Sequence, residues 1–219
     1  MTRGLRLLTA AALASGVMAS TAVPSSASGG PAGGGSGHDS SARSGVVRGQ
    51  ITFIKRPAHP WRSRITWIAR RQQADGTWKV IAHNSWRAGS GFPGRYTTNA
   101  CVKGRGWLPN GRYTLRQYND YPGTLIHGRA FRLSDKRCAN GTLRQALFIH
   151  TEAGPGNTQC PDKPGDQLCR WEYPKINDYT SHGCIKMSPG AILALTRAYH
   201  RFFKAGVRYP TSRVSLLVR

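Results

Sequence analysis

The segment Thr180–Leu195, TSHGCIKMSPGAILAL, marks the point where the predicted secondary structure changes from strands to a helix. Ser188 is a suitable N-cap, Pro189 suits the first helical position, and Gly206 suits the end of a helix. The apolar residues that follow recur at the three- and four-residue spacing of one helical face, namely Ile192, Leu193, Leu195, Tyr199, Phe202 and Phe203. We therefore predict a single late helix that begins at Pro189 and closes at Gly206.

Upstream of this segment the pattern is that of strands. Apolar residues alternate with polar ones around Trp67 and again around Val80, and the pair Asp75-Gly76 between them is a strong hairpin signal. Further strands are predicted at residues 111–119 (GRYTLRQYN), 125–133 (LIHGRAFRL), 145–154 (QALFIHTEAG) and 213–219 (RVSLLVR). The fold class that we predict is mainly β (α+β), with one C-terminal helix.

The first 45 residues do not resemble a folded domain. Residues 1–27 begin with two arginines, continue as an Ala/Leu-rich run and end on small residues, which is the layout of a secretory signal peptide. Residues 28–45 are Gly/Ser-rich and predict a flexible tether. We expect one domain at residues 46–219, secretion to the cell wall, and no transmembrane segment once the signal is removed.

The chain is strongly basic. It has 32 Lys and Arg against 9 Asp and Glu, a net charge of +23, and removal of the signal with its two arginines leaves +21. Such an excess attracts polyanions, and for a secreted protein these are phosphate-rich wall polymers or anionic lipids rather than nucleic acid. Because the charges are scattered along the sequence, we expect loose attraction to a negative surface rather than one specific polyanion site.

Five cysteines leave at least one thiol without a partner inside the chain. Export favours disulfides. Cys160 and Cys169 flank a Pro/Gly-containing loop that could close on itself, and Cys101 and Cys138 are then the natural second pair. This pairing leaves Cys184 free.

Cys184 has the neighbours of a reactive thiol. It lies four residues before Ser188 and two after His182. A helix N-terminus and an imidazole can lower the pKa of a cysteine from about 8.5 into the range ~3.5–7.5. We therefore predict that Cys184 is a nucleophile with a lowered pKa, helped by the free N–H groups of the helix that follows.

A histidine must act as the base. His150 ends an apolar strand where a loop begins, a position that both fixes and exposes a side chain, and His127 in LIHG is the second candidate. His182 is close to Cys184 in sequence, and we expect it to line the site rather than to serve as the base.

The motifs SHGCIKM (181–187) and FIHTEAG (148–154) together resemble the L,D-transpeptidase catalytic domain family, also called YkuD-like. GTWKVIAHNSWRAGSG (76–91) and LPNGRYTL (108–115) are similar to upstream parts of that family, so the resemblance covers roughly residues 64–219. It implies a β-sandwich-like pair of sheets, with the helix after the cysteine packed against it.

The same resemblance implies a mechanism. Cys184 attacks the third residue of a peptidoglycan stem peptide, His150 is the base, and the carbonyl of Thr151 orients His150. His182 and Gly183 shape the oxyanion region. The thioester then reacts with the side-chain amine of a second stem to give a 3–3 cross-link, or with water, which would make the enzyme an L,D-carboxypeptidase.

We expect the substrate site to include five further residues, Ser181, Lys186, Trp171, Tyr173 and His127, with Trp107 as another aromatic candidate. The chain departs from the family in three ways, one of which is that Leu108 stands where the family has Thr. His150 and Cys184 are 34 residues apart, which predicts an insertion pinned by a Cys160–Cys169 disulfide, and Lys186 stands where the family has Arg or Asn. We expect a monomer with no cofactor and no metal.

Four alternatives remain open at this stage. Cys184 could be half of a structural disulfide, or a zinc ligand together with Cys160, Cys169 and His182, although these spacings fit no familiar zinc motif. The enzyme could be sortase-like with His127 as base. The chain could also be a non-catalytic basic module that binds the wall.

Overall fold

The computed structural model describes residues 45–219. The predicted signal peptide, residues 1–27, and all but the last residue of the predicted tether lie outside the described residues. The first strand, β1 (Val47–Ile54), begins next to the predicted domain boundary at residue 46. No helix in residues 45–219 has the length and apolar character needed to cross a bilayer.

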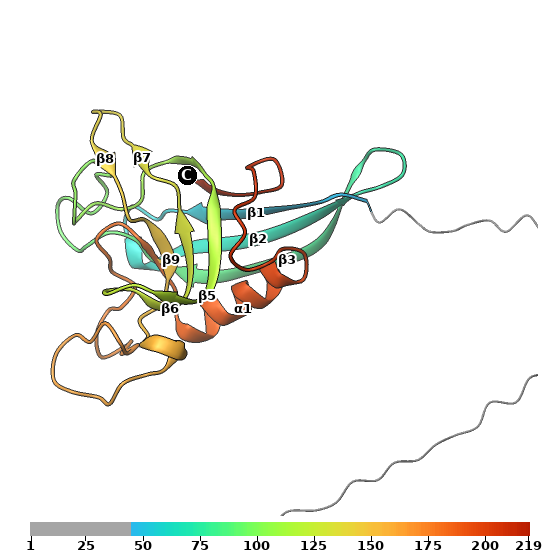
Figure 1. The fold of residues 1–219 in the computed structure, drawn as a ribbon. Coiled ribbons are helices and arrows are strands. Elements are labelled where there is room, and N and C mark those ends of the chain that lie inside the picture. The colour runs from blue at the N-terminus through green and yellow to red at the C-terminus, as the bar shows by residue number, and fades with distance from the viewer. Residues whose placement is uncertain (1–44) are drawn as a thin grey trace, which may run out of the picture. The chain divides into compact units, whose positions relative to one another are not determined.

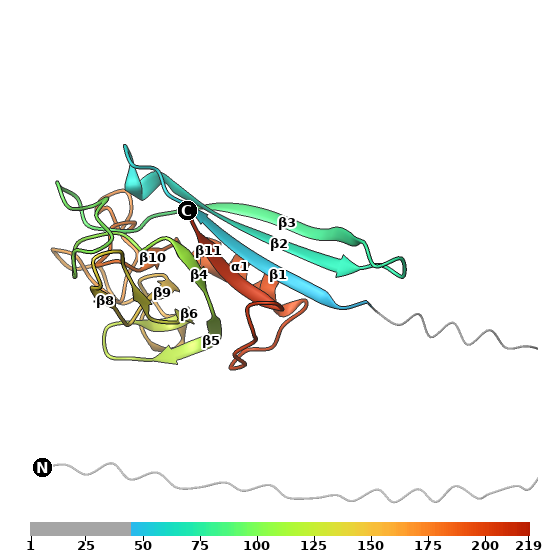
Figure 2. The same cartoon turned by 90° about the horizontal axis from the view of Figure 1, so that it is seen from above.

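A five-stranded sheet forms one layer of the domain (Figures 1 and 2). Its strand order is β3-β2-β1-β11-β4, with β2 (Ser63–Gln72), β3 (Trp78–Ala88), β4 (Gly111–Tyr113) and β11 (Val214–Val218). The predicted hairpin joins β2 to β3, and Gly76 adopts the positive φ of +82° that such a turn needs. β11 pairs with β1 in parallel, so the latest strand in the sequence lies inside the sheet.

A four-stranded sheet forms the second layer. Its order is β10-β9-β6-β5, with β5 (Leu115–Pro122), β6 (His127–Leu133), β9 (Phe148–His150) and β10 (Ile185–Lys186). The remaining short elements are β7 (Lys136–Arg137), β8 (Leu143–Arg144), and the 3-10 turns η1 (Pro60–Arg62) and η2 (Pro155–Asn157). The predicted strand at 111–119 is in fact two strands in different sheets, because β4 pairs with β11 whereas β5 pairs with β6.

The helix α1 (Pro189–His200) starts as predicted and ends earlier than predicted. The hydroxyl of Ser188 accepts a hydrogen bond from the Ala191 N–H at 3.4 Å, as an N-cap should. The helix ends at His200 and not at Gly206. The N–H groups of Phe202 and Phe203 both donate to the carbonyl of Tyr199, which tightens the chain into a turn after His200. Gly206 serves a later turn with a φ of +74°.

The helix packs against both sheets and shares one core with them. The ring of Tyr199 lies 6.0 Å from that of Trp67 in the five-stranded sheet and 5.4 Å from that of Phe131 in the four-stranded sheet. All three side chains are fully buried. The fold of the described residues is therefore mainly β with a single C-terminal α-helix, as the sequence predicted.

Candidate active site

Two short parallel strands bring the segments of Cys184 and His150 side by side. Ile185 pairs with Ile149, and Lys186 pairs with His150. Ile149 and Ile185 belong to the hydrophobic core. Because side chains alternate along a strand, Cys184 and His150 both lie on the opposite face of these strands from the core.

The hydrogen bonding of His150 defines which of its ring nitrogens is free. Its Nδ1 lies 2.8 Å from the carbonyl oxygen of Thr151, and only a protonated Nδ1 can donate to a carbonyl. Nε2 therefore carries a lone pair. Burial, and then the positive charge of Lys186, lower the pKa of His150 to about 3, so the imidazole is neutral and able to accept a proton.

Cys184 is a free thiol and is half-buried. Its Sγ points toward the carbonyl oxygen of Ala146, at 3.6 Å. Burial raises the pKa of Cys184 to about 11, although a backbone N–H of Phe148 and the charges of Lys186 and Arg144 act in the opposite direction. The predicted low-pKa thiolate is therefore wrong for the resting protein, which holds a neutral thiol beside a neutral imidazole.

The helix N-terminus, which we expected to lower the pKa of Cys184, does not adjoin this residue in the chain. Strand β10 separates Cys184 from α1, which begins only at Pro189. The N–H of Ala191 is already used by the Ser188 side chain. Since the field of a helix end falls off within about one turn, the positive charges near the thiol are those of side chains.

The hydroxyl of Ser181 fixes the conformation of the loop at residues 181–184, which we call the cysteine loop. Its Oγ accepts from the N–H of Gly91 and from that of Gly183, each at 3.2 Å, and donates to the carbonyl oxygen of Cys184 at 2.6 Å. This side chain is 4% exposed. We had predicted that Ser181 would bind substrate; its hydrogen bonds are instead made to the backbone around the nucleophile.

Gly183 fits a place that no other residue could fill. Its φ is +119°, and a Cβ added there would lie 2.0 Å from Nη2 of Arg144. The predicted role of Gly183 in shaping the oxyanion region stays a prediction, and the structure adds that its N–H already donates to Ser181.

Arg144 is a residue that the sequence analysis missed. It is 3% exposed and donates to the carbonyl oxygens of Gly106 at 3.1 Å and His182 at 3.2 Å, and also to that of Ala100. One guanidinium therefore joins the cysteine loop to the segment near residues 100–106. Its position six residues before His150 gives no motif by which sequence reasoning could have found it.

His182 lies at the exposed rim of the site. Its Nδ1 lies 2.5 Å from the carbonyl oxygen of Gly104, and its ring lies 5.0 Å from that of Phe92. His182 can therefore line the site, as predicted, but its ring is held by the loop around Gly104.

Lys186 makes a buried ion pair with Glu152. Burial raises the pKa of Glu152 to about 7, while the Lys186 charge lowers it. Carboxylate oxygens of Glu152, Asp166 and Asp178 lie within 4.8 Å of one another, a spacing that could hold a cation, and the ammonium group of Lys186 bonds to this cluster. We had predicted that Lys186 would bind substrate, and the structure ties it to Glu152.

The insertion between His150 and Cys184 carries the predicted disulfide between Cys160 and Cys169, and Cys101 pairs with Cys138. Disulfide sulfurs cannot serve as thiolate ligands, so the zinc alternative fails on Cys160 and Cys169, and the free Cys184 removes the alternative of a structural disulfide at that residue.

The predicted aromatic residues of the insertion form a small cluster. The rings of Trp171 and Tyr173 lie 4.9 Å and 5.3 Å from that of Tyr179, and the Arg87 guanidinium stacks on both tyrosines. Trp107, 9% exposed, lies under the ammonium group of Lys55. These contacts join Trp171 and Tyr173 to one aromatic cluster in which Tyr173 is 40% exposed, and their role in substrate binding stays a prediction.

His127 is far from the nucleophile. It begins β6, three residues before Ala130, which pairs with His150. At about 3.3 Å per residue this places it about 10 Å along the strand from His150, on the side away from Cys184. The structure therefore excludes His127 as the base of a sortase-like site.

Comparison with known proteins gives little beyond this geometry. No protein-family model and no curated protein matches the chain. Two solved structures are similar to it: the helical cell shape determining protein Pgp2 from Campylobacter jejuni, with a TM-score of 0.43 and 14% identity, and a lysine-to-alanine variant of that protein, with 0.42 and 15%. The matches cover 80% and 78% of this chain and 48% and 47% of those structures, so the chain spans about half of their length. Likeness at these TM-scores carries no argument about function.

Proposed function

We propose that the protein is a cysteine acyltransferase in which Cys184 is the nucleophile and His150 the general base. The observation that carries the proposal is the pairing of β9 with β10, which presents a free thiol and an imidazole with an unprotonated Nε2 on one face. Such a pair is the minimal apparatus for nucleophilic catalysis on an acyl group.

Proton transfer must accompany attack. Because the pKa of Cys184 is raised to about 11 and that of His150 is lowered to about 3, a stable thiolate–imidazolium pair does not form at neutral pH. His150 accepts the thiol proton as the sulfur attacks the substrate carbonyl. The carbonyl of Thr151 supports this step, since the Nδ1–H of His150 becomes a stronger donor to it when the ring turns positive.

The substrate that we propose is a peptidoglycan stem peptide, on the strength of the SHGCIKM and FIHTEAG motifs. The sulfur attacks the carbonyl of the third stem residue, the terminal D-alanine leaves with the proton held by His150, and a thioester to Cys184 remains. The amine of a second stem attacks this thioester and gives a 3–3 cross-link. The reaction is then that of an L,D-transpeptidase.

An exported location suits this substrate. Residues 1–27 have the composition of a signal peptide, and the structure contains two disulfides, which persist in oxidising compartments. We therefore propose that the protein acts at the cell wall.

The deciding experiment uses purified protein and muropeptides that carry a tetrapeptide stem. We expect D-alanine release, a thioester adduct on Cys184 by mass spectrometry, and loss of both in Cys184→Ala. The exposed helix substitution Arg197→Gln serves as the matched control and should retain activity. Unchanged muropeptides with the wild-type protein would refute catalysis and favour a non-catalytic wall-binding module.

The same assay separates the second candidate function. An L,D-carboxypeptidase releases D-alanine from monomers and forms no dimers when acceptor stems are in excess. The neutral resting thiol is compatible with either acceptor, so the ratio of dimer to tripeptide monomer is the quantity to measure.

A further inference from the structure

The outer face of the five-stranded sheet carries a concentration of arginines that the proposed catalysis does not use. Residues on this face alternate with the core residues Ile51 and Ile65. Arg48 and Arg70 are register partners on β1 and β2, so their side chains leave the sheet on the same side, away from the core.

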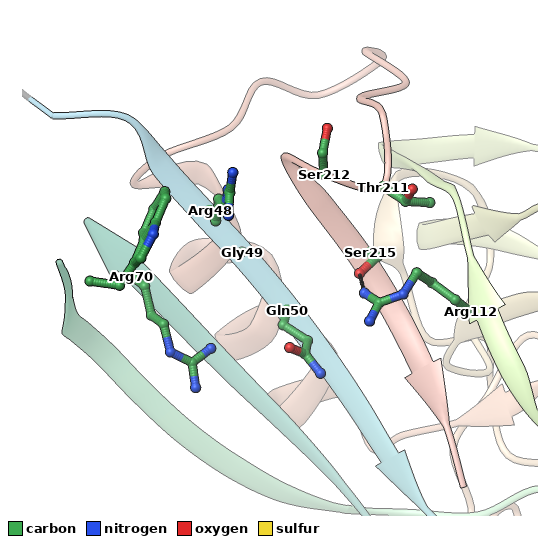
Figure 3. A pocket seen from close by; sticks show the side chains of 9 residues that line it. Arg48, Gly49, Gln50, Arg70, Arg112, Thr211, Ser212 and Ser215 are labelled. Carbon is green, nitrogen blue, oxygen red and sulfur yellow. Dashed lines mark hydrogen bonds between the residues drawn. The ribbon is translucent and has the colours of Figure 1, made fainter. Parts of the chain in front are cut away.

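A pocket of about 550 Å³ lies over this part of the sheet (Figure 3). Arg48, Arg70 and Arg112 line it, and Figure 3 shows them in front of β1, β2 and β11 with the helix behind the strands. Arg112 donates to Ser215 at 2.6 Å, and the guanidinium of Arg48 lies 4.2 Å from the ring centre of Trp78. Every charged side chain that lines the pocket is therefore a cation.

A second pocket, of about 270 Å³, repeats the same chemistry at the other end of the strands. It is lined by Arg56, Arg62, Arg64, Arg87 and Ser63. Arg64 pairs with Arg87 across β2 and β3 and shares its face with Arg70, six residues further along β2. At about 3.3 Å per residue the two arginine groups are about 20 Å apart.

Within residues 45–219 no acidic side chain forms an ion pair with these arginines. Asp75 is the only acidic residue between positions 45 and 119, and its carboxylate accepts two bonds from Thr77, at 2.9 and 2.7 Å. The three ion pairs found within residues 45–219 are all made by lysines. The seven arginines that line the two pockets thus lack a carboxylate partner in the described part of the chain, so their charge is available to an external anion, although Arg87 also donates to the Trp61 carbonyl and the Tyr173 hydroxyl.

We propose that this face binds a linear phosphodiester polymer that spans both pockets. The planar guanidinium matches two phosphate oxygens, and three or four arginines in each pocket can hold one phosphate group from several sides. A chain of repeating phosphates supplies one group to each pocket, whereas a single phosphate fills only one. The scattered charge of the sequence thus gathers into a specific polyanion site, contrary to our expectation from the sequence.

Two features favour a polymer without bases over nucleic acid and over a membrane. The guanidinium of Arg48 already covers one face of the aromatic side chain in the larger pocket, Trp78, so this ring offers at most one face for stacking on a base. Five of the arginines extend from strands of one sheet, and Arg56 and Arg62 lie between β1 and β2, whereas an amphipathic helix bound to a membrane presents its basic residues beside an apolar face.

The test is a binding titration of the full mature protein with a fluorescently labelled oligomer of glycerol phosphodiesters long enough to span both pockets. Affinity is measured by anisotropy at several salt concentrations. We expect Arg48→Gln/Arg70→Gln to weaken binding at least about tenfold and to reduce the slope of log affinity against log salt by about two. Arg64→Gln in the second pocket should reduce the slope as well. D-alanine release from soluble muropeptides should be unchanged in these variants, because they lie outside the catalytic site.

The matched control removes the same charge from another surface, with Arg197→Gln/Arg201→Gln on and just after the helix. An equal loss in this control would show that only net charge matters and would overturn the proposal. Inorganic phosphate that competes as well as the oligomer at equal phosphate concentration would overturn the two-pocket arrangement. Tighter binding to single-stranded DNA or to phosphatidylglycerol vesicles than to the oligomer would overturn the choice of partner.

Discussion

Lys186 lies opposite His150 across the parallel strands β10 and β9, and its ammonium group is paired with the carboxylate of Glu152. The lysine charge is thus held beside the imidazole, where it opposes protonation of the ring. The ion pair with Glu152, a residue of the segment between His150 and Cys184, therefore positions the lysine charge that lowers the pKa of His150, the proposed base.

The first prediction concerns the protonation of Cys184. With a pKa of about 11, about one molecule in ten thousand is ionised at pH 7, and the thiolate fraction rises tenfold for each pH unit. The rate of iodoacetamide alkylation of Cys184, followed by mass spectrometry, should therefore rise without a plateau between about pH 7 and 9. A rate that levels off below pH 8 would mean a low-pKa thiolate.

The second prediction concerns the space beside Gly183. Gly183→Ala places a Cβ 2.0 Å from Nη2 of Arg144 at a φ of +119°, so both the contact and the backbone are strained. We expect a loss of unfolding free energy of about 3 kcal/mol or more. The control is Gly141→Ala, which has a φ of +81° but open space around it, and which should cost only about 1 kcal/mol. Chemical denaturation measures both, and equal losses would show that the contact with Arg144 is unimportant.

The third prediction concerns Arg144. Arg144→Met keeps much of the buried side-chain volume but leaves the carbonyls of Gly106 and His182 without a donor. We expect a loss of about 2–4 kcal/mol in unfolding free energy and faster alkylation of Cys184 as its loop loosens. The exposed substitution Arg132→Gln should stay within about 0.5 kcal/mol of wild type. An unchanged alkylation rate in Arg144→Met would separate this residue from the active-site loop.

The fourth prediction concerns the pair Lys186–Glu152. Lys186→Met leaves Glu152 buried without its cation and should cost about 3–5 kcal/mol at neutral pH, whereas Lys186→Met/Glu152→Gln should recover much of that loss. Thermal or chemical unfolding of both variants measures the difference.

The pH dependence of the single variant gives an independent check. Burial raises the pKa of Glu152 to about 7 from the ordinary 4.5, so the folded protein holds this proton more tightly than the unfolded chain does. Stability from this group is therefore present at low pH and lost as pH rises through about 7. Removing Lys186 removes an interaction that lowers this pKa, so the pKa of Glu152 in Lys186→Met lies above about 7, and the defect should shrink as the pH falls from about 9 toward 7 and change little below it. A defect independent of pH would contradict this account.

The sequence predicted those features of the fold that depend on interactions between residues close together in the chain. The Asp75-Gly76 turn and the Ser188 cap each act within a few residues, and both occur in the structure. The end of the helix was not predictable in this way, because it depends on Phe203 entering the core beside Trp67, a contact between distant segments.

The candidate site shows the same division. Cys184 and His150 could be named from the sequence because each lies in a short motif. Arg144 and the Glu152–Lys186 pair could not, since their partners are 34 to 44 residues away in the chain. The pKa of Cys184 was wrongly predicted for a related reason: sequence placed the helix start near the thiol, whereas the strand β10 intervenes and burial dominates.

The position of β11 has a consequence for biosynthesis. Residues Val214–Val218 fill a place between β1 and β4, and both neighbours are translated much earlier. The larger sheet stays divided until these residues have left the ribosome, so the nascent polypeptide lacks a finished core until Val218 has emerged. Until β11 is available to pair with β1 and β4, the domain cannot complete its larger sheet, and the unfolded polypeptide can still pass through a narrow channel.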